Sequence, residues 1–217
     1  MVKEKFVQKI GIEQNVYVQV NPIDSNNILE LSREELKFDK KENELIVCAV
    51  GRLEPVKAYD RLLEVHKRLI DESIHHKIWI VGDGSQRDNL ESYVKKHRLE
   101  ETVTLWGYQE NPYKYIKNAD IYICSSIVEG LSSTALEATF LEKVIVSTDC
   151  PGMEEILGEN NENALIVKND TEGIYEGLKE ILTNKELRNR YQENIKKRCK
   201  LFNLETTMKQ IEKIIDE

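Results

Sequence analysis

The sequence alternates between short apolar runs and amphipathic stretches, and this alternation constrains the fold more than any other feature. Six runs rich in β-branched residues have the length of strands: Leu45–Val50, Lys77–Val81, Thr102–Trp106, Asp120–Cys124, Lys143–Ser147 and Ala164–Val167. The stretches between them have helical spacing: Tyr59–Asp71, Ser85–His97, Pro112–Lys117, Ser132–Leu141 and Met153–Leu157. Parallel strands need crossover connections, which are usually helices. The pattern therefore predicts an α/β fold, a Rossmann-like three-layer sandwich with about six mostly parallel strands.

The flanks of this core differ from it. Residues 171–217 lack convincing strands and predict helices over about 171–182, 185–199 and 204–216. Residues 1–42 hold one strand-like run, Val16–Val20, then a turn at Asn21–Asp24 and charged helical or irregular sequence. No βα unit precedes that strand, which suggests the end of a preceding domain.

Length and charge exclude several classes of protein. A chain of 217 residues allows one domain, or one domain with a tail, and not a two-domain enzyme. The 31 Lys and Arg residues against 39 Asp and Glu residues give a net charge of −8, so no global basic field favours nucleic acid or an anionic membrane. An anionic ligand must therefore be held by local cations and backbone dipoles.

The cysteines and the N-terminus indicate the compartment. The four cysteines lie far apart and form no C-x-x-C pair, which predicts free thiols in a reducing compartment. Cys48 and Cys124 lie inside apolar runs and are expected to be core residues. Neither a signal peptide nor a membrane span is expected. We expect a cytoplasmic location.

The loop after the first predicted strand, Gly51–Lys57, holds a glycine and two cations. Ligands of open parallel sheets bind outside the carboxyl ends of the strands. Arg52 and Lys57 are five positions apart before a helix and suit a diphosphate, although two exposed surface cations would explain the spacing equally well.

The loop after the second strand begins Gly82-Asp83-Gly84 and resembles the start of a dinucleotide fingerprint. Arg87 stands at the third glycine position, and no acidic residue ends the next strand, which argues against a nicotinamide cofactor. A tight turn in which Asp83 or Ser85 caps the following helix is the alternative.

The segment after the fourth strand, residues 125–138, carries the strongest signal. Glu129 stands at the strand exit, Gly130 and small polar residues follow, and Glu137 lies further along. A rise of about 1.5 Å per residue predicts roughly 12 Å between the two glutamates along a helix axis. The start of this helix offers N–H groups to a phosphate. In the alternative interpretation, Glu129 interacts with the helix dipole and Glu137 is an ordinary surface residue.

Together these motifs resemble a known family. The ordered set G-R-L-x-x-x-K, G-D-G and E-G-L-S-S-T-A-L-E-A, with two glutamates eight positions apart, resembles the C-terminal, donor-binding half of retaining glycosyltransferases of the GT-B fold. The resemblance runs from about Val16 to the C-terminus, and includes Asn21–Asp24 and Thr148–Gly152. It is closest to the group that includes transferases of capsule, lipopolysaccharide and teichoic-acid assembly.

The resemblance implies a role for each matching residue around the donor diphosphate. Arg52 and Lys57 would neutralise its charge, and the backbone N–H groups of Leu131, Ser132 and Ser133 would hold it from the other side. No metal ion would be needed, and the sequence has no Asp-x-Asp motif. No other cofactor is implied.

Further roles concern the rest of the nucleotide sugar. Glu129 would hydrogen-bond the sugar and, with the two cations, form the catalytic set. Glu137 would bind the ribose, and the Gly107-Tyr108 loop would meet the base. The implied donor-binding set is completed by Gly51, Gly82, Asp83, Gly84, Tyr108 and Gly130. The reaction would transfer a hexosyl group, most simply from UDP, to an acceptor hydroxyl with retention of configuration.

The resemblance also implies missing parts. Residues 1–42 would be a remnant of the N-terminal domain and a linker, residues 43–184 the nucleotide-sugar-binding domain, and residues 185–217 helices that pack on the absent N-terminal acceptor domain. Ser132 and Ser133 replace a glycine-rich turn common in the family, which leaves the sugar open. Two alternatives are a binding module with a separate acceptor-domain partner and an unrelated nucleotide-binding domain. Peripheral association of the full enzyme with the inner face of the membrane stays open.

Overall fold

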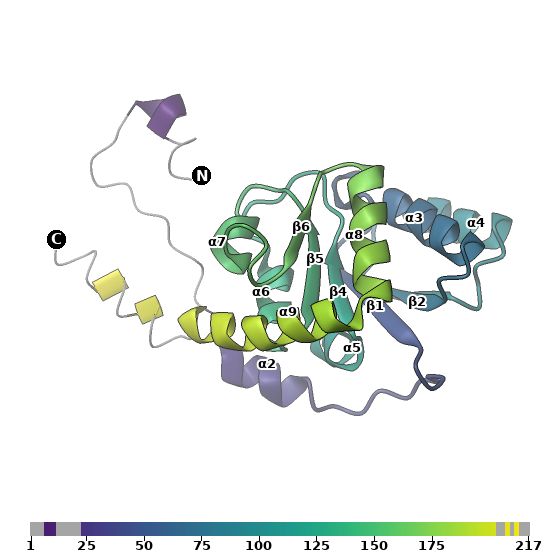
Figure 1. Ribbon diagram of the computed structural model, residues 1–217, viewed down its shortest axis with the longest axis horizontal. Helices are drawn as coiled ribbons and strands as arrows, with labels where there is room; N and C mark the ends of the chain where they lie inside the picture. Colours follow the sequence, from purple (N-terminus) through teal and green to yellow (C-terminus); the bar gives the residue numbers. More distant parts are fainter. Residues whose placement is uncertain (1–6, 12–22, 203–206, 209–210, 213–217) are drawn as a thin grey trace.

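The chain forms a six-stranded, wholly parallel sheet covered by helices on both faces (Figure 1). The computed structural model describes residues 7–11, 23–202, 207–208 and 211–212. The strands are β1 Leu45–Val50, β2 His76–Val81, β3 Val103–Gly107, β4 Ile121–Cys124, β5 Val144–Thr148 and β6 Leu165–Val167. The helices labelled in Figure 1 are α2 Ser25–Leu31, α3 Tyr59–Asp71, α4 Arg87–Lys96, α5 Tyr113–Asn118, α6 Ser133–Phe140, α7 Met153–Leu157, α8 Thr171–Thr183 and α9 Lys185–Arg198.

The strand order is β3-β2-β1-β4-β5-β6, so β1 has β2 on one side and β4 on the other. The chain winds outward in one direction from β1 to β3 and then in the other direction from β4 to β6. The switch in direction lies between β1 and β4, and ligands of open parallel sheets bind outside the carboxyl ends of the strands at such a point. The topology therefore predicts that a ligand site includes the loops after these two strands.

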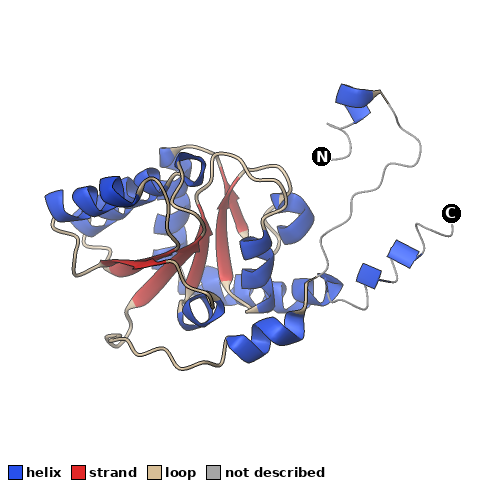
Figure 2. Ribbon diagram, turned by 180° about the vertical axis from the view of Figure 1, so that it is seen from behind, coloured by secondary structure: helices blue, strands red, loops and turns tan. Residues whose placement is uncertain are grey.

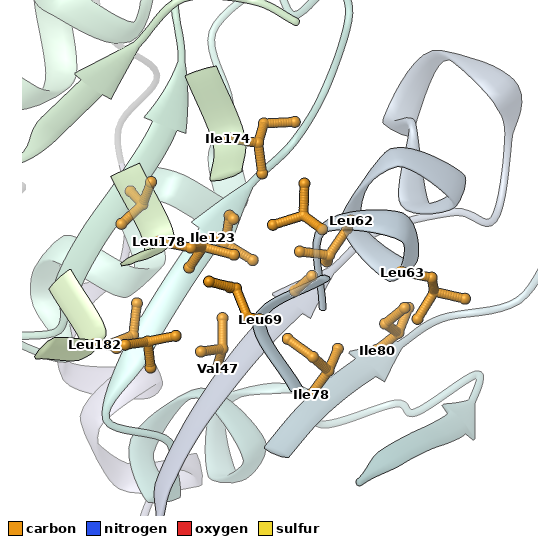
Figure 3. Close-up of a cluster of buried hydrophobic side chains, with 14 of the residues drawn as sticks. Val47, Leu62, Leu63, Leu69, Ile78, Ile80, Ile123, Ile174, Leu178 and Leu182 are labelled. Carbon is orange, nitrogen blue, oxygen red and sulfur yellow. The ribbon is translucent and has the colours of Figure 1, made fainter. Parts of the chain in front are cut away.

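Alternating residues of each strand pack into two hydrophobic cores. Val47 and Ala49 of β1 face a core shared with α3, α4 and α8, while Ile46 and Cys48 face a core shared with α2, α5, α6 and α7. Figure 3 shows the first core, in which Leu62 and Leu69 of α3 and aliphatic residues of α8 lie over the strands. Helix α9 supplies residues to both cores and runs crosswise to α8. Figure 2 shows the sheet between its two layers of helices.

The predicted elements agree closely with the observed ones. Every predicted strand within the described residues is present within about one residue, and α3 and α7 have the predicted bounds. The three-layer α/β prediction is confirmed. The predicted strand Val16–Val20 and most of the predicted last helix lie outside the described residues.

Helix α2 was foreseen only as helical or irregular sequence. Asp24 caps it, because its carboxylate accepts hydrogen bonds from the N–H groups of Asn26 and Asn27, each at 3.1 Å. Ile28 is its buried anchor in the core on the α6 side. With one buried residue in seven, the sequence carries too little periodicity to predict this helix.

Candidate functional site

The loops after β1 and β4 are tied together at the switch point of the sheet. The N–H of Ile127 donates to the carbonyl of Val56 at 2.8 Å, and the hydroxyl of Ser125 donates to the carbonyl of Lys57 at 2.8 Å. Asn169, which follows β6, donates to the carbonyl of Ile127 at 2.8 Å. These bonds hold the two predicted charge-bearing segments in a fixed relation.

Lys57 and Glu129 meet across these loops. The Lys57 Nζ lies 2.6 Å from Glu129 Oε1, and the two side chains are only 20% and 11% exposed. Such shielding makes this pair stronger than a typical surface ion pair. Lys57, which we expect to bind the diphosphate, thus neutralises Glu129, which we expect to bind the sugar. The two predicted site residues form one cluster.

The glycines after β1 and β2 allow the two loops to touch. A Cβ on Gly82 would lie 2.0 Å from the carbonyl oxygen of Gly51, and the φ of Gly82 is +142°, so a side chain does not fit there. Gly84 is also tight, since a Cβ there would lie 2.8 Å from the backbone nitrogen and oxygen of Leu53. Close contact between loops, rather than close approach to a ligand, is what Gly82 and Gly84 provide in this structure.

A hollow of about 200 Å³ opens beside these glycines at the carboxyl ends of β1, β2 and β3. Arg52, Asp83 and Tyr108 are among its lining side chains, and Tyr108 is 77% exposed. The full lining is Val50, Gly51, Arg52, Val81, Gly82, Asp83, Tyr108, Gln109 and Pro112. Five of the predicted donor-binding residues therefore share one depression next to the Lys57–Glu129 pair.

Helix α6 begins at Ser133 with Ser132 as its N-cap, whose hydroxyl accepts from the N–H of Ala135 at 3.4 Å. Glu129 therefore lies in the loop before the helix. The premise of the expected separation of roughly 12 Å, that both glutamates lie on one helix, is wrong, because helical rise does not apply to residues 129–132. The alternative that Glu129 acts on the helix dipole is also weakened, since its carboxylate is paired with Lys57.

The start of α6 presents free N–H groups. Within the described part of the chain, the backbone N–H groups of Leu131, Ser132 and Ser133 donate no hydrogen bond. The first turn of α6 contains no acidic side chain. This helix start therefore keeps both its donors and its positive dipole end available to an anion.

Glu137 is partly buried, and this burial raises the pKa of its carboxyl to about 7. It is not the ordinary exposed helix residue of the alternative interpretation. Tyr113 of α5 lies near enough for the Glu137 charge, together with burial, to raise the pKa of that phenol. No hydrogen bond among the described residues joins Glu137 to Lys57 or Glu129.

The alternative for the second loop is correct in its tight turn, which the N–H of Arg87 closes by donating to the carbonyl of Gly84 at 3.1 Å, but wrong in its capping residues. Gln86 is the N-cap of α4 and makes no side-chain capping bond. Asp83 instead accepts from the N–H of Gly84 at 2.8 Å, and Ser85 donates to Glu54 at 2.8 Å. These side chains brace the loop and do not cap the helix.

The cysteines are all free, and Cys48, Cys124 and Cys150 are buried. Burial raises the pKa of the Cys124 thiol to about 11, which keeps it protonated. This confirms the prediction of core residues. In the described part of the chain, no group of three or more His, Cys, Asp or Glu side chains could hold a metal ion. No described helix is both long enough and apolar enough to cross a bilayer.

Comparison with known proteins gives the family. A family model for glycosyl transferases group 1 matches residues 32–198. The chain belongs to the glycosyl transferases group 1. This glycosyltransferase is 30% identical, over 92% of its length and 53% of the relative's, to the N-acetylgalactosamine-N,N'-diacetylbacillosaminyl-diphospho-undecaprenol 4-alpha-N-acetylgalactosaminyltransferase of Campylobacter jejuni. It is 27% identical to the poly(ribitol-phosphate) alpha-N-acetylglucosaminyltransferase of Staphylococcus aureus, over 69% of this chain and 31% of that relative.

Solved structures of low sequence identity share its fold. HepE of Anabaena, in complex with UDP, superposes with a TM-score of 0.82 at 17% identity, and the match covers 99% of this chain and 61% of that one. TarM of S. aureus, in a complex that contains UDP, gives 0.80 at 19% identity over 99% and 42%. The chain spans between about a third and a little over half of the length of the curated relatives that it matches.

Sequence reasoning overlooked the residues that support Glu129. Ser126 donates to the Glu129 carboxylate, and Thr148 at the end of β5 and Cys150 in the loop after it donate to the backbone carbonyl of Ser126. The one available signal was the position of Ser126, three residues before a glutamate at a strand exit.

Proposed function

We propose that this chain is the donor-binding half of a retaining glycosyltransferase, which moves a hexosyl group from a nucleotide diphosphate sugar to an acceptor hydroxyl in cell-surface glycan synthesis. The observation that carries the proposal is the meeting of Lys57 and Glu129 at the switch point, between the hollow beside Arg52 and the free N–H groups of α6. Relatives named for the transfer of N-acetylhexosamines support it, as do fold neighbours that contain UDP.

In this proposal the diphosphate lies between the two loops. Arg52 and Lys57 neutralise it from one side, and the N–H groups of Leu131, Ser132 and Ser133 contact it from the other. These groups are fixed before the reaction begins, so they stabilise the charge that develops on the departing diphosphate without reorganising. A metal ion is then not required, because the cations and the helix take that role.

The remaining groups set the orientation of the donor. The base lies in the hollow beside Tyr108, Glu137 accepts hydrogen bonds from the ribose hydroxyls, and Glu129 accepts them from the sugar. The acceptor is supplied by an N-terminal domain of the full enzyme. The expectation that residues 185–217 pack on that domain does not hold for α9, whose apolar residues Leu187, Tyr191 and Ile195 are buried in the two cores of this domain. With its N-terminal domain the full enzyme works in the cytoplasm, at the inner face of the membrane.

Calorimetric titration of the chain with UDP, GDP and ADP, each with and without Mg²⁺, tests the proposal. We expect saturable binding of UDP that is unchanged by chelation of metal ions. Arg52→Ala and Lys57→Ala should each lose about 1.5 to 3 kcal/mol of binding free energy, the usual value of a charge-assisted contact. Lys95→Ala is the matched control, because Lys95 is exposed at the C-terminal end of α4, away from the site. Unchanged affinity in both site variants would remove the assignment of the diphosphate.

A further inference from the structure

Ser126 is buried beneath the Lys57–Glu129 pair and is only 2% exposed. Its hydroxyl donates to Glu129 Oε1 at 2.5 Å and accepts from the thiol of Cys124 at 3.5 Å. A hydroxyl that donates to a carboxylate makes a short, charge-assisted hydrogen bond. Ser126 is thus a fixed support for the carboxylate from inside the protein, while Lys57 approaches as the second donor.

The backbone of Ser126 is itself anchored from β5 and the loop that follows it. Its carbonyl oxygen accepts from the Thr148 hydroxyl at 2.6 Å and from the Cys150 thiol at 3.1 Å. Thr148 is completely buried. Gly152 keeps this second loop close, since a Cβ there would lie 2.3 Å from the carbonyl of Gly130. The position of the Ser126 hydroxyl is therefore set by contacts between two segments that are distant in sequence, residues 124–130 and 148–152.

Both strong donors reach the same carboxylate oxygen. Glu129 Oε1 accepts from Lys57 and from Ser126, and the Cys124 thiol lies 3.8 Å from it. Glu129 Oε2 has no hydrogen-bond partner in the part of the chain that the structure describes. One oxygen is therefore held by the protein and the other remains free to accept from a ligand hydroxyl.

The two donors differ in what happens when a donor substrate binds. Lys57 is on a flexible side chain and would turn toward a diphosphate, because that group carries more negative charge than a carboxylate. Ser126 cannot turn toward the diphosphate with Lys57, because Ser126 is buried and its backbone carbonyl is held by Thr148 and Cys150. After Lys57 leaves, Ser126 is the strong donor that still fixes Glu129.

We propose that Ser126 is a positioning residue that holds the Glu129 carboxylate against the donor sugar once Lys57 has turned to the diphosphate. The inference rests on the proposed function and deepens it. Ser126 does not touch the nucleotide in this arrangement, so its loss acts on the sugar part of recognition alone.

The test compares the affinity for UDP with that for UDP-glucose, UDP-N-acetylglucosamine and UDP-N-acetylgalactosamine, in the wild-type chain and in Ser126→Ala. The readout is the ratio of the affinity for each UDP-sugar to the affinity for UDP. A general structural defect would lower both affinities and would leave this ratio unchanged. We expect Ser126→Ala to remove most of that gain, up to about tenfold, with UDP affinity within about twofold of wild type. Ser126→Cys leaves no cavity and retains a weak donor, so it gives a smaller loss in the same direction and serves if the alanine variant fails to fold.

Ser32→Ala is the matched control, because Ser32 is 3% exposed and its hydroxyl also makes one buried bond, to the carbonyl of Leu29 at 2.9 Å. It should change neither affinity. An unchanged sugar gain in the Ser126 variants, or a loss of UDP affinity in parallel with it, overturns the inference. If the wild-type chain binds UDP but binds none of the UDP-sugars more tightly than UDP, the inference about Ser126 is also overturned, while the nucleotide site is retained. A wild-type chain that binds no nucleotide refutes the proposed function and the inference together.

Discussion

Glu137 is expected to make nucleotide binding depend on pH near neutrality. Burial raises the pKa of its carboxyl to about 7, so the group is mostly protonated at pH 6 and mostly ionised at pH 8. The ionised fraction rises from about 9% to about 91% between these values, by the titration relation. If the carboxylate is the form that accepts hydrogen bonds from the ribose hydroxyls, the association constant for UDP rises about tenfold over the same range.

Glu137→Gln separates this effect from the titration of the UDP phosphate. The amide has nearly the same shape and cannot ionise, whereas the phosphate titrates identically for both proteins. Calorimetric titrations of the two proteins at pH 6, 7 and 8 give the ratio of their affinities. The ratio should grow with pH by about tenfold, and a ratio that stays constant would refute the combination of a pKa near 7 and a ribose contact made by the carboxylate.

The Glu137 carboxyl also makes folding stability depend on pH, but in the opposite direction to UDP binding. Its folded-state pKa lies above the ordinary value, so the folded chain binds more protons than the unfolded chain between about pH 4.5 and 7. The free energy of unfolding therefore falls as the pH rises through that window, by at most about 3 kcal/mol. Glu137→Gln should be more stable than wild type at pH 8, as measured by urea denaturation.

Three further predictions concern stability and are checked by urea denaturation. Gly82→Ala should lower the free energy of unfolding by about 2 to 4 kcal/mol, because the added Cβ meets a backbone carbonyl. Gly130→Ala is the control and should leave the free energy of unfolding nearly unchanged, since there is open space around Gly130. Equal effects of the two substitutions would contradict the packing argument. His66 and His76, hydrogen-bonded to each other at 2.9 Å, have pKa values lowered by burial to about 3 and 4. In the Glu137→Gln background, where the opposing titration of Glu137 is absent, the free energy of unfolding should fall by about 2 kcal/mol per histidine as the pH drops from 7 to 5; a flat profile in that background would exclude this. Arg198→Ala should lower the free energy of unfolding by about 1 to 2 kcal/mol, since the Arg198 guanidinium donates to two backbone carbonyls at the end of α7. Arg198→Lys should be destabilised by a similar amount, because an ammonium group does not reproduce the planar pair of donors.

The strands could be predicted because their signal is local. The runs of the central strands, such as Leu45–Val50 and Ile121–Cys124, are buried on both faces in a parallel sheet, and this burial appears in the sequence as an uninterrupted apolar run. Helix α3 could be predicted for a similar reason, since its buried residues recur at helical spacing along the sequence.

The site was only partly predictable because its contacts are not local. Lys57 and Glu129 are 72 positions apart, and only the strand order that places β1 beside β4 brings them together. The start of α6 was misjudged around Glu129 because Gly130 and Ser132 permit a loop as readily as a first turn. Ser126 carries no charge and no periodic signal, so its contact with the carboxylate emerges only from the fold.

The Lys57–Glu129 pair also has a kinetic consequence. In the empty site the lysine is already neutralised, and the chain as a whole carries a net charge of −8, so an approaching nucleotide diphosphate meets repulsion over most of its path. Dissolved salt screens this repulsion, with a Debye length of about 8 Å at physiological ionic strength. The association rate should therefore rise as salt is added, opposite to the behaviour of an electrostatically steered ligand, and the lysine should be recruited only after the diphosphate has arrived.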